Sequence, residues 1–300
     1  MNIKEQLERI SATEENKNAL YDIFRNIDEN SIPIIRYLLP AGTDFFRQRV
    51  NRAGEDFNKI SELSYPPAEF VLEYGRVNIP YNPMFYCSTF NANIDSNTIY
   101  PRLTTLLETS LFARDKLTSG IERTTCSKWI AKVDLNLIAL PFSSSYKRPN
   151  RDISIIQQEW NRIARYYNGD KRGLELVEYM SDEIAKDYKN SIDYFKIAHF
   201  IYYLMWENPK TRDADGILYP SVQTGGEGFN IALKPKSADN NLMFDGASLC
   251  YLAKKREKMY LKIINYSDND NGYIRYFKRD ISHEEEVIYS QYSEGLEFIN

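Results

Sequence analysis

The spacing of hydrophobic positions predicts helices in two separate parts of this 300-residue chain. Within residues 1 to about 40, Leu20, Ile23 and Phe24 recur at the interval that places side chains on one face of a helix. A longer stretch with the same period covers about residues 154–207. We therefore expect an N-terminal helical extension and a helical block inserted in the second half of the chain.

Shorter apolar runs, some with alternating polar positions, predict β-strands elsewhere. Residues 268–272, with the sequence Asp-Asn-Asp-Asn-Gly, are typical of a tight turn between the last two strands. A further helix is expected over residues 101–113. The expected strands are 44–50, 84–87, 132–140, 217–219, 229–233, 259–265 and 273–278. This order of elements indicates an α+β fold on a mixed β-sheet, with residues 41–300 as its main domain.

Composition and charge argue against several classes of function. The chain has 43% hydrophobic residues, enough for a sizeable core, and a formal net charge of -4. That charge disfavours broad electrostatic binding to nucleic acid or to a membrane surface. The first residues lack the apolar core of a signal peptide, and the apolar run 198–206 is too short to span a bilayer. We expect a cytoplasmic protein without direct contact to nucleic acid or membrane.

The cysteines and histidines form no recognisable site pattern. Cys87, Cys126 and Cys250 are odd in number and widely spaced, which fits neither a disulfide framework nor a zinc site. The two histidines, His199 and His283, lie far apart in the sequence. We therefore expect no metal and no bound cofactor, and we look for chemistry among the other polar residues.

The loop between the expected strands 217–219 and 229–233 is rich in glycine and small polar residues. It carries Ser221 and three glycines, and Asn230 follows it. Glycine lets a backbone approach a ligand closely, and hydroxyl and amide groups supply short hydrogen bonds. The loop is a candidate site for a small polar molecule, and the alternative is an ordinary hairpin with a flexible tip.

Charged residues near the expected strands add candidate contacts. Arg47 and Arg49 are two apart on a strand and share one face, so together they can clamp a phosphate or pyrophosphate. The alternative is a solvated strand face paired with acids. Arg76 lies in a turn-rich segment just before the strand that carries Tyr86. Glu108 stands among leucines, where a carboxylate usually has a partner or a task.

Four segments together resemble the motifs of the RES-domain family, which is named for an arginine, a glutamate and a serine. They occur in the family's order and span about residues 42–235. The first contains Arg47, the second Arg76 and Tyr86, the third Glu108, and the fourth Ser221. The resemblance implies a fold related to ADP-ribosyltransferases and an activity that degrades NAD. Many members of the family are toxins that a partner antitoxin neutralises.

The resemblance also implies roles for individual residues. Glu108 would be the main catalytic carboxylate, and Tyr86 would pack against the nicotinamide or its ribose. Ser221 would hydrogen-bond the nicotinamide ribose or a phosphate. The residues expected to bind NAD phosphates, an attacking inorganic phosphate or the rest of the substrate are Arg47, Arg49, Arg76, Asn78 and Asn230.

Three alternatives stay open at this point. Water as acceptor gives ADP-ribose, whereas inorganic phosphate gives ADP-ribose 1-phosphate. A protein acceptor would make the chain a protein ADP-ribosyltransferase on the same site. Hydrolysis and phosphorolysis count together as NAD degradation and the protein transferase is the second hypothesis, so a domain that binds a nucleotide or a partner without chemistry is the third. In each case NAD or a related nucleotide is the expected ligand, and an antitoxin protein is the expected partner.

Overall fold

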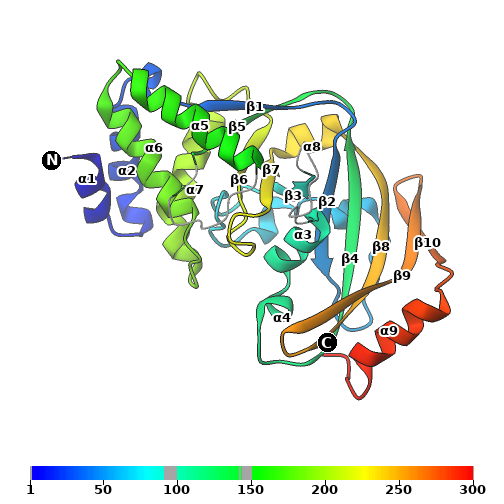
Figure 1. Ribbon diagram of the computed structural model, residues 1–300. Helices are drawn as coiled ribbons and strands as arrows, with labels where there is room; N and C mark the ends of the chain where they lie inside the picture. Colours follow the sequence, from blue (N-terminus) through cyan, green and yellow to red (C-terminus); the bar gives the residue numbers. More distant parts are fainter. Residues whose placement is uncertain (1, 91–99, 142, 144–150, 300) are drawn as a thin grey trace.

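The computed structural model describes residues 2–90, 100–141, 143 and 151–299. In this part of the chain, a 10-stranded mixed sheet is combined with N-terminal helices and an inserted helical segment (Figure 1). The α+β fold class that the sequence predicts is therefore confirmed.

The sheet has the strand order β1-β5-β6-β7-β3-β2-β4-β8-β9-β10. Neighbouring strands are antiparallel, except that β5 and β6 are parallel. The strands are β1 Ile35–Leu39, β2 Asp44–Val50, β3 Phe85–Thr89, β4 Gly120–Ala131, β5 Leu135–Ala139, β6 Gly216–Pro220, β7 Phe229–Leu233, β8 Leu242–Lys255, β9 Lys258–Asp270 and β10 Tyr273–Lys278.

Helices occur before, between and after the strands. The α-helices are α1 Ile3–Arg9, α2 Lys17–Arg25, α3 Pro101–Thr109, α4 Leu111–Arg114, α5 Arg151–Tyr166, α6 Lys171–Ile184, α7 Phe195–Tyr202, α8 Pro235–Asn241 and α9 His283–Ser293. Short helical turns at Ile60–Leu63, Ser191–Tyr194 and Tyr203–Glu207 complete the helical content that bears on the site.

The N-terminal helices and the inserted block form one helical layer beside the sheet. Helix α1 packs against α6, and α6 packs against α7 (Figure 1). Phe24 of α2 meets Phe200 of α7 with ring centroids 5.5 Å apart, and both side chains are fully buried. Burying a side chain of this size contributes about 1.5–3 kcal/mol. The two helical parts, far apart in sequence, therefore stabilise each other.

His199 of α7 is buried at the junction between these helices and the chain before the sheet. Its Nδ1 hydrogen-bonds the Tyr21 hydroxyl at 3.2 Å, and its Nε2 hydrogen-bonds the Tyr74 hydroxyl at 3.2 Å. The Tyr74 hydroxyl also donates to the carboxylate of Glu14. Burial, followed by the positive charge of Lys17, lowers the pKa of His199 to about 4. The neutral imidazole is the form that this junction accommodates.

We predict that His199 makes the fold sensitive to acid. The folded pKa lies below the ordinary value of 6.5, so the unfolded chain binds the proton more readily between pH 6.5 and about 4. The contribution of the neutral His199 to the free energy of unfolding is fully present above pH 6.5. It falls by up to about 3 kcal/mol as the pH decreases through this window. Urea unfolding at a series of pH values should show this loss in the parent and not in His199→Gln. His283→Gln, at an exposed position, is the matched control. An identical pH dependence in the parent and His199→Gln would remove His199 as the cause.

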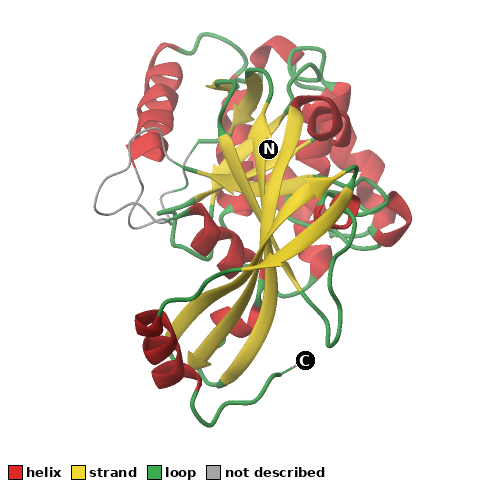
Figure 2. Cartoon of the chain, turned by 90° about the vertical axis from the view of Figure 1, so that its right-hand side faces the viewer, coloured by secondary structure: helices red, strands yellow, loops and turns green. Residues whose placement is uncertain are grey.

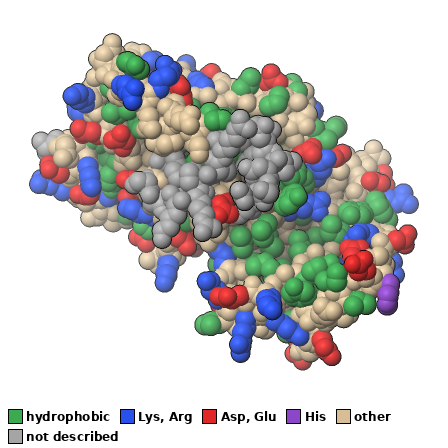
Figure 3. All heavy atoms as spheres, viewed as in Figure 1, with side chains coloured by type: hydrophobic (Ala, Val, Ile, Leu, Met, Phe, Trp, Pro, Cys, Tyr) green, Lys and Arg blue, Asp and Glu red, His purple; other side chains and the backbone are tan. Residues whose placement is uncertain are grey.

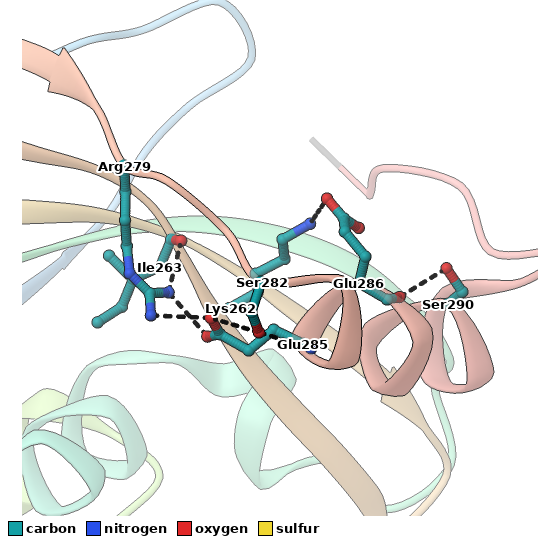
Figure 4. Close-up of polar contacts among 7 residues, drawn as sticks. All are labelled: Lys262, Ile263, Arg279, Ser282, Glu285, Glu286 and Ser290. Atoms are coloured by element: carbon teal, nitrogen blue, oxygen red, sulfur yellow. Dashed lines mark hydrogen bonds and ion pairs between the residues drawn. The ribbon is translucent and has the colours of Figure 1, made fainter.

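The long strands β4, β8 and β9 project beyond the helical layer, and α9 packs against β8 and β9 (Figure 2). In the space-filling view, hydrophobic side chains gather over this end of the molecule (Figure 3). The Ser282 hydroxyl accepts from the Glu285 backbone N–H at 3.2 Å and so begins α9. Arg279 holds Glu285 with two bonds of 2.8 and 2.9 Å, and Lys262 donates to Glu286 at 2.6 Å (Figure 4). These contacts fix α9 to β9.

The hydrophobic pattern predicts helix to about residue 40, but Ile35–Leu39 forms strand β1. Ile35 and Leu39 are buried, while Arg36 and Leu38 are exposed, which is the two-residue alternation of a strand. The segment pairs with β5, so it belongs to the main sheet. Five residues of this pattern are too few to separate a strand from the end of a helical stretch without the pairing partner.

Other predicted boundaries also shift. The expected helix 101–113 is interrupted at Ser110, whose backbone is extended and whose hydroxyl accepts from Ala113 N–H at 2.8 Å to start α4. The expected strand 132–140 begins only at Leu135. Strands β4 and β8 have no sequence prediction, because most of their positions are buried and neither alternates along its whole length. In β4 the fully buried positions include Thr124 and Ser127, which read as loop residues in a sequence.

The two halves of the sheet are joined by β2 and β3, which pair over only two positions, Phe45 with Thr89 and Phe46 with Ser88. Beyond these pairs β2 continues with β4, whereas β3 continues with β7. The strands therefore separate at Arg47. Backbone groups along such an opening need other hydrogen-bond partners. This separation opens a large cleft.

Candidate functional site

A cleft of about 980 Å³ lies where β2 and β3 separate. Its walls come from β2, β3, α3, α4, the segment before β3 and the inserted segment 187–194. The volume is at the upper end of the range for sites that enclose small molecules and cofactors. The predicted site residues that line it are Arg47, Arg49, Arg76, Asn78, Tyr86, Glu108 and Asn230.

Glu108 is held by two residues, Ser221 directly after β6 and Asn230 in β7. The Ser221 hydroxyl donates to Glu108 Oε1 at 2.6 Å, and Asn230 Nδ2 donates to the same oxygen at 2.9 Å. Ser221 is fully buried and Asn230 is 6% exposed, so both donors are fixed in place. In the described residues Glu108 Oε2 has no hydrogen-bond partner. The carboxylate is oriented through one oxygen and offers the other to the cleft.

Glycine brings the Ser221 loop against α3. A Cβ at Gly228 would lie 2.4 Å from Thr104 Oγ1, so only glycine allows this approach. The Ser221 N–H donates to the Gly228 carbonyl at 2.9 Å, and Gly226 N–H donates to the Ser221 carbonyl at 2.9 Å. The close approach inferred from the sequence is real for Gly228, but its neighbour is a helix and not a ligand. Gly228 therefore acts by placing Ser221 beside Glu108.

We predict that Gly228→Ala lowers stability by about 1–3 kcal/mol, because the added methyl group overpacks the contact with Thr104. Thermal unfolding of the purified protein measures the loss. Thr104→Ala removes the opposing atoms at small cost, since Thr104 Oγ1 is buried without a hydrogen-bond partner in the part of the chain that the structure describes. The double variant Gly228→Ala with Thr104→Ala should recover most of the stability. A double variant that loses as much stability as the two single variants together would contradict this steric account.

Arg47 fills the opening between β2 and β3. Its Nη1 donates to the Tyr86 carbonyl at 2.8 Å, and its Nε donates to the Ser64 carbonyl at 3.2 Å. Its guanidinium lies 5.6 Å from the centre of the Phe85 ring. Burial, followed by the positive charge of Arg49, lowers the pKa of Arg47 to about 10. In the described residues it makes no ion pair, so an anion in the cleft would be its first counter-charge.

Arg49 follows on the same face of β2. It donates to the carbonyl of Glu62 and stacks over Phe57 at 4.5 Å. A solvated strand face paired with acids, the alternative that the sequence left open, does not describe Arg47 and Arg49. Arg47 and Arg49 both line the cleft, and the described residues hold no acidic partner for either.

Arg76 connects the cleft to the inserted block. Its Nη1 donates to the carbonyls of Ile184 at 2.5 Å and Lys186 at 2.6 Å, and its Nη2 lies 3.9 Å from Asp187 Oδ1. It also donates to the Tyr194 hydroxyl at 3.3 Å. Several of its donors are therefore already used by protein atoms. The observed contacts give Arg76 a positioning role on the cleft wall, and contact with a substrate phosphate stays a prediction.

Tyr86 and Asn78 form one unit. The Tyr86 hydroxyl donates to Asn78 Oδ1 at 2.5 Å, and Asn78 Nδ2 donates to the carbonyls of Glu73 and Ile79 at 3.4 and 3.3 Å. Burial raises the pKa of Tyr86, so the hydroxyl keeps its proton. Asn78 is 8% exposed. Its amide therefore orients Tyr86 within the cleft wall.

The cleft also contains residues that the sequence analysis does not single out. Tyr188 and Tyr194 come from the inserted block and meet edge to face at 5.2 Å, and Gln223 donates to Asp187 at 2.9 Å across to the serine loop. No sequence signal marks the two tyrosines, because only the fold brings the block to the cleft. The further lining residues are Tyr219, Thr105 and Arg114. Arg114 lies six residues after Glu108 in the predicted helical region, where a search for anion-binding arginines could have included it.

The charges of the cleft favour anions. Among the residues that the structure describes, five with cationic side chains line it, against two with carboxylates. The cations are Arg47, Arg49, Arg76, Arg114 and Lys189, and the carboxylates are Glu108 and Asp187. A concave site with an excess of positive charge raises the local concentration of negatively charged ligands.

Among residues 2–90, 100–141, 143 and 151–299, no cluster of three or more His, Cys, Asp or Glu side chains could hold a metal ion. No helix in these same ranges has the length and apolar character needed to cross a membrane. A scan of the sequence against models of known families gives no match, and neither does a search of curated proteins. The site is therefore defined by its own geometry as a cleft in an α+β protein that presents one oriented carboxylate among several arginines.

Proposed function

We propose that this cleft is the active site of an NAD-degrading enzyme of the RES type, which cleaves the bond between nicotinamide and ribose. The observation that carries the proposal is the orientation of Glu108 by Ser221 and Asn230 inside a cleft lined by Arg47 and Arg49. These are residues of the segments that resemble the RES family. Their convergence from distant parts of the sequence supports the proposal.

The chemistry needs few groups. Cleavage of the nicotinamide–ribose bond develops positive charge on the ribose, as in glycoside hydrolysis. A fixed carboxylate stabilises that charge or holds the ribose hydroxyls, and Glu108 Oε2 faces the cleft for this task. Nicotinamide leaves as a neutral molecule from a cationic precursor, so a general acid is not required. The lack of a histidine among the lining residues agrees with this scheme.

The arginines and tyrosines complete the substrate site. Two arginines on one strand suit the pyrophosphate of NAD, because each guanidinium offers a planar set of donors. Anchoring the pyrophosphate would place the ribose against Glu108. Tyr86 and Tyr219 supply aromatic walls, against which a nicotinamide ring could pack.

Incubation of the purified protein with NAD, with and without inorganic phosphate, tests the proposal. Nicotinamide release only with phosphate, together with ADP-ribose 1-phosphate, identifies a phosphorylase. Release in both conditions, with ADP-ribose as product, identifies a glycohydrolase. Transfer of labelled ADP-ribose to protein identifies the transferase. Intact NAD in every assay, with protein purified free of any bound partner, contradicts the enzyme and leaves a binding domain.

The biological role that we propose is that of a toxin acting in the cytoplasm and neutralised by an antitoxin protein. A chain that consumes NAD would lower the NAD content of its own cell. Expression of the chain alone should therefore slow growth and reduce cellular NAD, and the Glu108→Gln variant should not. Equal growth of cells with either protein would contradict the toxin role.

A further inference from the structure

We propose that Arg114, together with Arg49, forms a second anion subsite in the cleft that takes a phosphate dianion. Arg114 is the last residue of α4 and lines the cleft. Arg114 is half-buried as a residue, its Nε is fully buried, and no hydrogen bond or ion pair reaches it from the described residues. The binding of phosphate follows from these observations alone, whereas its place in a reaction rests on the proposed function.

An unpartnered guanidinium at this depth is unusual. Buried polar groups nearly always have a hydrogen-bond partner, and a charge without one is costly. Other basic side chains of this protein have partners: the fully buried Lys254 donates to two backbone carbonyls, and Arg123 pairs with Asp56 at 2.5 Å. The Nε of Arg123 has no partner among the described residues, as for Arg114, but its guanidinium has this counter-charge. Arg114 departs from it where the surface is concave and open to a ligand. The missing partner is therefore best supplied by an anion from solution.

The local structure places Arg114 close to the arginines of β2. The Thr109 hydroxyl, at the end of α3, donates to the Gln48 carbonyl at 3.4 Å, and Gln48 lies between Arg47 and Arg49. The interruption at Ser110 then turns the chain into α4, since the Ser110 hydroxyl starts that helix and donates to Glu122 at 2.5 Å. These bonds hold α3 against β2 and the start of α4 against β4. Arg114 and Arg49 both line the cleft.

The charge balance of the cleft indicates room for a dianion. Its five cations and two carboxylates leave an excess of three positive charges. NAD brings two negative phosphates and one positive pyridinium, so two positive charges remain uncompensated when it is bound. A phosphate monoester, whose second pKa is about 6, carries close to two negative charges at neutral pH. Inorganic phosphate has a higher second pKa and is a mixture of monoanion and dianion there. The lowered pKa of Arg47, caused in part by Arg49, shows the same crowding of positive charge.

The phosphate has two sources with the same chemistry. Free inorganic phosphate could attack the ribose: a phosphate oxygen bonds to C1′, the C1′–N bond breaks, and its electron pair leaves with neutral nicotinamide. The product is ADP-ribose 1-phosphate. Alternatively, the dianion could be a phosphate monoester of the substrate itself, such as the 2′-phosphate of NADP. Both sources require a fork of donors, which arginine supplies better than lysine.

Direct binding tests the subsite without any turnover. Calorimetric titration with inorganic phosphate, and with 2′,5′-ADP compared with 5′-AMP, is made on the parent and on Arg114→Gln. We expect the variant to bind the dianion at least 10-fold more weakly, with Arg114→Lys intermediate. Lys116→Gln is the matched control. Lys116 lies two residues after Arg114 and carries the same charge, but it forms an exposed ion pair with Glu257. Equal dissociation constants in the parent and Arg114→Gln, or no measurable binding of any of these anions to the parent, would overturn the proposal.

Thermal unfolding shows whether weaker anion binding by Arg114→Gln results from a damaged fold. Ligand binding raises the unfolding temperature of the form that binds it. Phosphate should therefore stabilise the parent and Lys116→Gln more than Arg114→Gln. Without phosphate, Arg114→Gln should unfold at the same or a higher temperature, because it removes an uncompensated partly buried charge. A large loss of stability in Arg114→Gln without any anion would show that Arg114 is a structural residue and would refute the subsite.

Kinetics then separate the two sources. If free phosphate occupies the subsite, Arg114→Gln raises the KM for phosphate at least 10-fold and leaves the KM for NAD nearly unchanged. If the 2′-phosphate occupies it, the parent prefers NADP to NAD, and the variant loses that preference. Wild-type constants for phosphate, NAD and NADP in Arg114→Gln would count against the subsite. If neither nucleotide is consumed by the parent, the proposed function fails, while the binding titrations still decide the subsite.

Discussion

Glu108→Gln should lower the rate of nicotinamide release by about two to four orders of magnitude, the range seen when one electrostatic stabiliser is removed from an active site. Glutamine keeps the shape of the side chain and an acceptor for Ser221 and Asn230. The substitution removes only the negative charge that would face the developing positive charge on the ribose. We expect little change in stability and in NAD affinity, so the effect should appear in kcat.

A suitable control is Glu122→Gln. Glu122 also accepts a serine hydroxyl, from Ser110 at 2.5 Å, and is 4% exposed, but it does not line the cleft. Both variants are compared by initial rates of nicotinamide release and by thermal unfolding. Parental turnover in a folded Glu108→Gln protein would show that another group carries the chemistry. The Ser221→Ala variant should lose less, since Asn230 still orients the carboxylate.

Arg47→Ala should raise the KM for NAD by about 10- to 100-fold, the cost of losing charge-assisted hydrogen bonds to a phosphate. Arg47 also donates to the Tyr86 carbonyl in the opening between β2 and β3, so some stability is lost as well. Arg47→Lys restores the charge without the planar set of donors and should recover only part of the affinity. The comparison separates charge from geometry.

Binding to an inactive background isolates the role of Arg47. NAD is titrated into Glu108→Gln with and without Arg47→Ala, so turnover does not interfere. Arg102→Ala is the matched control, because Arg102 lies on α3 and stacks over Phe46 without lining the cleft. A dissociation constant unchanged by Arg47→Ala would remove Arg47 from the substrate site. Weaker binding in Arg102→Ala to the same degree would point to a general electrostatic effect.

Local sequence patterns predict some parts of this fold well. Strand β2 matches the expected residues 44–50, and β7 matches 229–233. The predicted turn before β10 is present at Asn271 and Gly272, which both have positive φ. The inserted helical block is also confirmed in α5, α6 and α7. These elements carry their own signal, in hydrophobic period or in turn residues, and need no partner to be recognised.

Strands that depend on their neighbours in the sheet are not predicted by the local sequence. Ile35–Leu39 is a strand because β5 supplies its hydrogen-bond partners, and β4 is a strand because β2 and β8 flank it. Buried polar residues such as Thr125 weaken the apolar signal of β4, while its hydroxyl is satisfied by Asn51 at 2.9 Å. Only the assembled sheet provides that compensation.

The sequence by itself determined which residue types could act here: a glutamate among leucines, paired arginines on a strand, and a serine in a glycine-containing loop. It could not show that Ser221 and Asn230 donate to the same oxygen of Glu108, more than a hundred residues away. The tertiary structure alone decided that β2 and β3 separate after two pairs, which opens the cleft. It also brought Tyr194 and Arg114 into the cleft wall. The physical reason is that these contacts depend on how strands and helices pack at long range, which no local period along the chain encodes.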